Sequence, residues 1–247
     1  MASTATSRQD NQQVFVLHTY PFKETSLVVE LFTRDFGRVA AVAKGARRPR
    51  SAMRGMLQSF QPLLATWSGK NELRNLHSLE WGEGLLLLQG PALMCGFYMN
   101  ELLLRLLPRE DGHDELFNYY AQTLRELSKN GSKSQDTAIT LRRFELKMLQ
   151  EMGYAVPLEI DEEDAPISSE QSYYYLPERG ACHPRTKSQQ QNGVQLSGKT
   201  LLDMARNQYA DLQTQQQSKQ LMRILLGHYL GDKPLHTRQL LIDLQEL

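Results

Sequence analysis

The sequence predicts an α+β, multidomain protein in which a five-stranded β-barrel domain precedes an all-helical domain with an irregular insertion. Two observations predict this order. Short runs of β-branched and aromatic residues, separated by turn residues, fill the first 82 positions. Beyond Pro91, apolar residues recur at helical spacing, apart from one polar stretch. We place the domains at residues 1–84 and 85–247, with the insertion at about 158–195.

The first domain contains five segments with strand character. They are Val14–Leu17, Ser26–Thr33, Arg38–Ala43, Phe60–Trp67 and Leu73–Trp81. Phe36 and Gly37 mark a turn between the second and third segments, and residues 68–71 (SGKN) separate the last two. Pro62 suits a strand start or an edge, where no ladder donor is lost. Five short strands joined by tight turns predict a small closed or sandwiched β-domain.

The second domain contains six segments with helical periodicity. They are 91–107, 114–130, 136–152, 197–207, 214–230 and 236–247. Pro91 suits a first helical turn, and Asp114 and Asp136 are suitable N-caps. The stretch Asp161–Gly193 breaks the rhythm, because it holds an acidic run, three consecutive tyrosines and a Ser/Gln-rich segment. We expect a loop with a small hairpin there.

Net charge is zero over the whole chain, but it is unevenly distributed. Residues 1–82 contain 11 Lys and Arg against 6 Asp and Glu, whereas residues 83–247 contain 17 against 22. A basic domain joined to an acidic one suggests a polyanionic partner for the basic part. A chance fluctuation in composition is the alternative.

Compartment is indicated by what the sequence lacks. The polar N-terminus has no apolar segment typical of a secretory signal. The longest uninterrupted apolar segment, Leu85–Leu88, is too short to span a bilayer. Two cysteines, Cys95 and Cys182, cannot build a disulfide framework. We expect a cytoplasmic protein with no membrane partner.

A basic, loop-forming stretch is the sharpest local feature. Between Arg34 and Arg54 lie seven basic residues and one acid, and Gly45 and Pro49 favour a loop within it. Arginine forks match phosphate oxygens, and barrels with basic loops bind single strands. The candidate nucleic-acid-binding residues are Lys23, Arg34, Arg38, Lys44, Arg47, Arg48, Arg50 and Arg54, with Phe22 as a base-stacking aromatic. A solvated face or a targeting signal is the alternative, and the other barrel aromatics fit a core.

None of the candidate catalytic motifs in the sequence supports an active site. The chain has no dinucleotide fingerprint of the form Gly-x-Gly-x-x-Gly. The acidic run Asp161–Asp164 leaves a metal-dependent nuclease as an alternative, although consecutive carboxylates in a polar loop seldom converge on one ion. Cys182 and His183 are a single pair, whereas structural zinc needs four ligands. We expect no enzyme activity, no metal and no other cofactor.

Several stretches resemble the RecO family of bacterial DNA repair and recombination mediators. In the first domain they are Val16–Leu27, Phe36–Arg38 and Val42–Arg48. In the second they are Asn100–Leu103, Leu141–Leu146, Gly153-Tyr154, Gly231–Leu235 and Thr237-Arg238. The likeness covers almost the whole chain in the same order, which makes it far more specific than any one motif.

This resemblance implies an N-terminal OB-fold that binds single- and double-stranded DNA and anneals complementary strands. It also implies RecR and the acidic C-terminal tail of the single-stranded-DNA-binding protein as partners, and the loading of RecA onto coated gaps at the nucleoid. Many members hold zinc in paired Cys-x-x-Cys motifs in the insertion. Only Cys182 is present here, so the insertion is expected to be degenerate, zinc-finger-like and zinc-free. A generic OB-fold RNA-binding factor is the alternative.

A candidate site for that tail lies on the third predicted helix. An acidic tail ending in Phe needs an apolar pocket flanked by cations. Arg142 and Arg143, beside Phe144 and Leu146, offer that combination. The alternative is that an arginine pairs within the protein and Phe144 belongs to the core.

Overall fold

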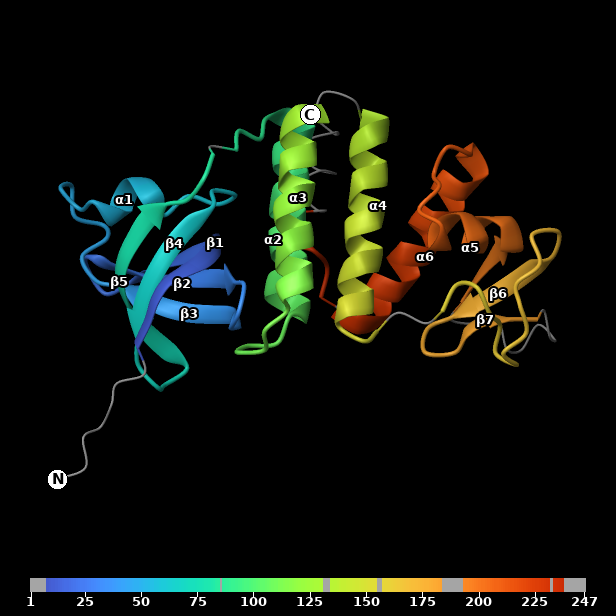
Figure 1. The fold of residues 1–247 in the computed structure, drawn as a ribbon, viewed down its shortest axis with the longest axis horizontal. Coiled ribbons are helices and arrows are strands. Elements are labelled where there is room, and N and C mark those ends of the chain that lie inside the picture. Colours follow the sequence, from blue (N-terminus) through green and yellow to red (C-terminus); the bar gives the residue numbers. More distant parts are fainter. Residues whose placement is uncertain are drawn as a thin grey trace. The chain divides into compact units, whose positions relative to one another are not determined.

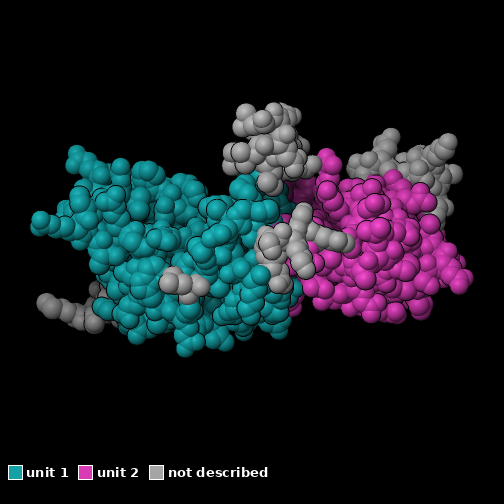
Figure 2. All heavy atoms as spheres, turned by 90° about the horizontal axis from the view of Figure 1, so that it is seen from above, with its two compact units in different colours: residues 1–133, 235–247 teal, residues 134–234 magenta. Residues whose placement is uncertain are grey.

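The computed structural model describes residues 8–84, 86–130, 134–154, 157–183, 193–231 and 233–237. The chain forms two compact units, coloured separately in Figure 2. Unit 1 comprises residues 1–133 with 235–247, and unit 2 comprises residues 134–234. No helix among the described residues is both long and apolar enough to cross a membrane.

Unit 1 begins with a closed five-stranded barrel in the order β1-β2-β3-β5-β4 (Figure 1). Its strands are β1 (Arg8–Phe22), β2 (Ser26–Thr33), β3 (Gly37–Ala43), β4 (Leu63–Ser68) and β5 (Leu73–Trp81). Neighbours are antiparallel except β3 and β5, which run parallel, and the short helix α1 (Met53–Met56) lies between β3 and β4 in the chain. The predicted barrel of five strands is confirmed, and it has an OB-like topology.

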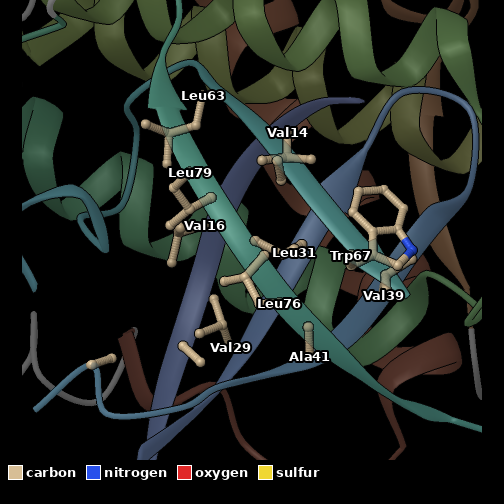
Figure 3. Packing of buried hydrophobic residues seen from close by; sticks show 13 residues of the cluster. Val14, Val16, Val29, Leu31, Val39, Ala41, Leu63, Trp67, Leu76 and Leu79 are labelled. Carbon is tan, nitrogen blue, oxygen red and sulfur yellow. The ribbon is translucent and has the colours of Figure 1, made fainter. Parts of the chain in front are cut away.

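Alternate residues of the strands fill the barrel interior (Figure 3). The cluster includes Val14, Val16, Val29, Leu31, Val39, Ala41, Leu63, Trp67, Leu76 and Leu79. Phe36 meets the Trp67 ring edge-on at 5.7 Å between centroids. Each large aliphatic side chain buried in this way contributes about 1.5–3 kcal/mol relative to exposure. The strand pattern in the sequence therefore encodes a packed barrel rather than an open sheet.

A β-bulge in β1 changes which side chains face outward. Val16 pairs with Leu31 of β2, but His18 pairs with Glu30, so Leu17 is the extra residue. Directly opposite residues of an antiparallel pair share a face. Because Leu31 points inward and Glu30 outward, the even-numbered residues of β1 are inside before the bulge and outside after it.

Helices α2 (Gly90–Leu106) and α3 (Asp114–Asn130) belong to unit 1 and pack on part of the outer barrel face. Phe15 and Phe32 of the barrel meet Phe117 and Tyr120 of α3, with ring centroids 5.1 to 5.7 Å apart. Unit 1 therefore combines barrel and helices in one compact body. The predicted boundary after residue 84 stays a prediction, since compactness does not show which segment folds alone.

Buried hydrogen bonds fix this packing. The Asn100 side chain donates to the Leu17 carbonyl at 2.9 Å and accepts from the Tyr120 hydroxyl at 2.6 Å. Burial raises the pKa of Tyr120, which keeps the hydroxyl a donor. The two hydrogen bonds join β1, α2 and α3 through one side chain.

The chain returns to unit 1 near its C-terminus. The Glu101 carboxylate accepts hydrogen bonds from the backbone N–H of His236 at 2.7 Å and of Thr237 at 2.9 Å. Burial alone would raise the pKa of Glu101, but the hydrogen bonds from Thr237 and His236 outweigh it and hold this pKa below its usual value. The remainder of the helix predicted over 236–247 lies outside the described residues.

Unit 2 contains helices α4 (Ser134–Glu151), α5 (Gly198–Ala205) and α6 (Leu212–Leu230). A three-stranded sheet in the order β7-β6-β8 lies between α4 and α5 in the chain. Its strands are β6 (Ser172–Leu176), β7 (Gly180–Cys182) and β8 (Val194–Ser197). Tyr173 and Tyr175 of β6 are buried. The hairpin expected in the insertion is present, and β8 adds a strand that the sequence did not predict.

Candidate nucleic-acid interface

Two loops meet at one end of the barrel. They are the β1–β2 turn, residues 23–25, and the segment from β3 to α1, residues 44–52. The Arg47 N–H donates to the Thr25 carbonyl at 2.9 Å, and Arg47 Nη1 donates to the Glu24 carbonyl at 3.2 Å. The Gly45 N–H lies 3.4 Å from Ser26 Oγ. These hydrogen bonds hold the two loops together, although they are far apart in the sequence.

This end of the barrel carries a set of exposed cations, which we call the basic loop cluster. Its members are Lys23, Lys44, Arg47, Arg48, Arg50 and, at the start of α1, Arg54. Within the described residues, none of the six has an ion pair. The Lys23 ammonium lies 5.4 Å from the centroid of the half-buried Phe22 ring. The cluster can therefore offer its charges to an external polyanion.

The β3–α1 segment is a series of tight turns. The Arg48 N–H donates to the Gly45 carbonyl and the Ser51 N–H donates to the Arg48 carbonyl, each at 3.0 Å. Gly45 has a φ of 69°, a left-handed conformation that glycine adopts without a steric cost. Turns of this kind hold the backbone while the long arginine side chains extend into solvent.

Arg34 and Arg38 do not belong to the basic loop cluster. Strand β3, with 7 residues, separates the β2–β3 turn from the β3–α1 segment, a span of about 20 Å. Arg34 is exposed in that turn beside Asp35. The sequence places all seven basic residues in one run, but antiparallel pairing of β2 and β3 sends the two halves to opposite ends of the barrel.

Arg38 is committed to contacts inside unit 1. Its Nη1 lies 3.5 Å from Glu30 Oε2, and its Nε donates to the Leu107 carbonyl at 3.1 Å. Burial, and next the nearby Arg109, lower the pKa of Arg38, while Glu30 acts in the opposite direction. The prediction of Arg38 as a DNA-binding residue stays a prediction, and in the structure a buried carboxylate and a carbonyl at a helix C-terminus hold its guanidinium.

Arg109 is a cation that sequence reasoning missed. Its Nη2 lies 2.6 Å from Glu30 Oε1, and 38% of its side chain stays exposed. Two guanidinium groups thus share the Glu30 carboxylate, which leaves a net positive charge on the outer barrel face. Arg109 is 79 residues from Glu30 in the chain, so no local signal could have placed it there.

The predicted tail site on α4 has a different geometry from the one expected. Phe144 and Leu146 are buried, and Arg142 Nη2 lies 2.5 Å from the fully buried Glu145 carboxylate. Arg143 lies 5.8 Å from the centroid of the Tyr209 ring and donates to the Asn207 carbonyl at 3.5 Å. These residues form core and internal pairs rather than an open pocket flanked by exposed cations. Tail binding itself stays a prediction without an assigned surface.

The acidic run and the Cys-His pair in unit 2 are used locally. Asp161 accepts hydrogen bonds from the backbone N–H of Glu163 and Ala165, both at 2.9 Å, and these bonds lower its pKa. His183 Nε2 lies 3.0 Å from Asp161 Oδ2, and the Cys182 thiol is buried. No group of three or more potential metal ligands occurs among the residues described. The side chains at Cys182 and His183 therefore do not fit a zinc ion, which needs four ligands.

Comparison with known proteins gives a consistent result along the chain. The family model described as Recombination protein O N terminal matches residues 8–84, and Recombination protein O C terminal matches residues 87–238. A DNA repair protein RecO from Nitrosospira multiformis is 55% identical over 241 residues, covering 97% of this chain and 98% of the relative. DNA repair proteins RecO from Aromatoleum aromaticum and Thiobacillus denitrificans are 51% and 48% identical and also cover nearly the full length of both chains.

Proposed function

The chain belongs to the RecO family of bacterial DNA repair proteins, and from that premise we propose that it binds single- and double-stranded DNA and anneals complementary strands. The observation that carries the proposal is the basic loop cluster, whose six exposed cations have no ion-pair partner among the described residues. Phosphate contacts position a nucleic acid without reading its sequence. One cluster can therefore serve both single strands and duplexes.

The proposed mechanism needs no covalent step, no metal and no other cofactor. Arg and Lys side chains neutralise phosphates on two strands and release their counterions. Neutralisation lowers the repulsion between the strands, so complementary bases meet more often and pair. The protein thus acts as a mediator of repair rather than as an enzyme.

The family assignment also supports a set of partners. We place the protein in the cytoplasm at the nucleoid, where it works with RecR to load RecA onto gaps coated with single-stranded-DNA-binding protein. Binding to the C-terminal tail of the coating protein would hold the basic loop cluster close to the covered strand. Such tethering raises the effective concentration of the second contact without strengthening any single one.

Charge reversal tests the proposal. The triple substitution Arg47→Glu, Arg48→Glu and Arg50→Glu should weaken binding to every DNA sequence by about 100-fold or more near 0.1 M salt, because about three phosphate contacts are lost. Annealing of complementary oligonucleotides, bare or coated with the cognate coating protein, should fall in parallel. Truncating the coating protein's tail should slow only the reaction on coated strands.

A matched control has the same change in charge elsewhere. Arg206, Lys219 and Arg223 are exposed in unit 2, and their triple replacement by Glu should leave binding to bare DNA within a few-fold of the parent. If the loop variant anneals bare strands as well as this control, the assignment of DNA binding to the basic loop cluster is wrong.

A further inference from the structure

We propose that His18, Tyr20 and Phe22 form a base-stacking row for single-stranded DNA on the outer face of β1. The inference rests on the proposed DNA binding and adds to it the groups that would recognise unpaired bases. The basic loop cluster contacts phosphates, which duplexes and single strands share. A row of aromatic rings would favour single strands, because only their bases are free to stack on protein side chains.

The bulge at Leu17 creates the row. Without the extra residue, the alternation that places Val14 and Val16 in the barrel core would also turn residues 18, 20 and 22 inward. With it, His18, Tyr20 and Phe22 lie opposite Glu30, Val28 and Ser26 of β2, on the outer face. The bulge moves three aromatic side chains, at alternate positions of β1, out of the barrel core. Their apolar surface is then lost from the core, which indicates that these side chains have a function on the surface.

Exposure separates these rings from the aromatic residues of the barrel core. His18 is exposed, Tyr20 is 45% exposed and Phe22 is half-buried. Phe15, Phe32 and Trp67 are all at most 3% exposed. The His18 and Tyr20 rings lie 4.5 Å apart at an interplanar angle of 61°. This edge-on contact orients the two rings while leaving ring surface open for a base.

Positively charged side chains lie at both ends of the row formed by His18, Tyr20 and Phe22. Lys23 follows Phe22 directly and is part of the basic loop cluster. At the other end, His18 faces Glu30, around which Arg38 and Arg109 leave a net positive charge. A single strand laid along β1 would therefore find rings for its bases and guanidinium or ammonium groups for its phosphates. This combination is the one that sequence-independent single-strand binding sites use.

The test compares a normal oligonucleotide with an abasic oligonucleotide of the same length, by fluorescence anisotropy on the full chain. The parent protein should bind the base-bearing strand about 10- to 100-fold more tightly than the abasic one. His18→Ala with Tyr20→Ala should reduce this ratio to about threefold or less, with duplex affinity and salt dependence unchanged. Tyr20→Phe, which keeps the ring, should retain the preference, and Tyr20→Ser alone should lose part of it.

Trp81 provides a control of similar exposure, at 49%, on β5, and Trp81→Ala should leave the preference for bases unchanged. The inference is overturned if the double variant and the Tyr20→Ser variant keep the parental ratio, or if Trp81→Ala lowers it equally. Failure of the proposed function gives a distinct result. In that case Arg47, Arg48 and Arg50 charge reversal would leave binding to both oligonucleotides unaffected, whereas otherwise it weakens both and preserves their ratio.

Discussion

Two pairs of adjacent arginines in this chain have similar sequences and opposite surroundings. Arg47 and Arg48 lie in the basic loop cluster, exposed and without an ion pair among the described residues. Arg142 and Arg143 lie on α4, where Arg142 pairs with Glu145 and Arg143 contacts Tyr209 and Asn207. The difference teaches that a count of positive residues does not separate cations that serve a partner from cations that hold the fold.

What separates them is the supply of carboxylates. Glu145 is three positions after Arg142 on the same helix, so the two side chains share a face and can pair locally. Residues 36–54, by contrast, contain no Asp or Glu at all. Its turns also leave no neighbouring helical face to supply one. The loop cations therefore stay available to solvent and to phosphate.

The largest effect expected from this comparison is on stability. Arg142→Ala should lower the free energy of unfolding by about 3 kcal/mol, because it removes the guanidinium partner of a carboxylate with no solvent exposure. Urea titration followed by circular dichroism measures the loss, and binding to bare DNA should be unchanged. Arg48→Ala is the matched control in the basic loop cluster. Equal destabilisation by the two substitutions would remove the distinction between the two arginine pairs.

Glu30 allows the comparison to be tested within the barrel itself. Glu30→Gln removes the carboxylate that Arg38 and Arg109 share. The two guanidinium groups then lose their ion pair and can contact phosphates instead. We expect a loss of about 2 kcal/mol in the free energy of unfolding and a gain of about fivefold in single-strand affinity at low salt, since a nearby negative charge no longer repels phosphates.

The control for Glu30 is an exposed carboxylate on β5. Glu80→Gln changes net charge by the same amount at an exposed position, and it should alter stability by less than about 0.5 kcal/mol. Unchanged stability in Glu30→Gln would show that the shared carboxylate does not hold the two arginines.

The fold could be predicted from local patterns because most elements are encoded locally. The β2 segment Ser26–Thr33 and the helix Asp114–Asn130 have the predicted bounds, since turn residues and an N-cap mark their ends. The strand Val194–Ser197 was missed. It has only 4 residues and exists because it pairs with β6, and pairing between distant segments leaves no periodic signal in so short a run.

The candidate site was predicted only in part, for a related reason. The position of the β3–α1 loop could be predicted, because Gly45, Pro49 and the basic residues beside them are local features of the sequence. The separation of Arg34 from that loop depends on strand pairing, and the ion pairs of Arg38 and Arg109 depend on packing between β2 and the segment after α2. The outward row at His18 and Tyr20 depends on a bulge. An inserted residue of this kind shifts the alternation by one, and nothing in the alternation itself reveals it.

The smallest expected effect concerns single neutralisations at the two ends of the barrel. Arg48→Ala should lower the slope of log affinity against log salt by about 0.7 for a single strand, with stability changed by less than about 0.5 kcal/mol. Arg34→Ala, at the far end of β3, should leave that slope unchanged. Anisotropy titrations at several salt concentrations measure both. If Arg34→Ala lowers the slope as much as Arg48→Ala does, phosphates contact both ends of the barrel, and the DNA path must run along β3 rather than end at the basic loop cluster.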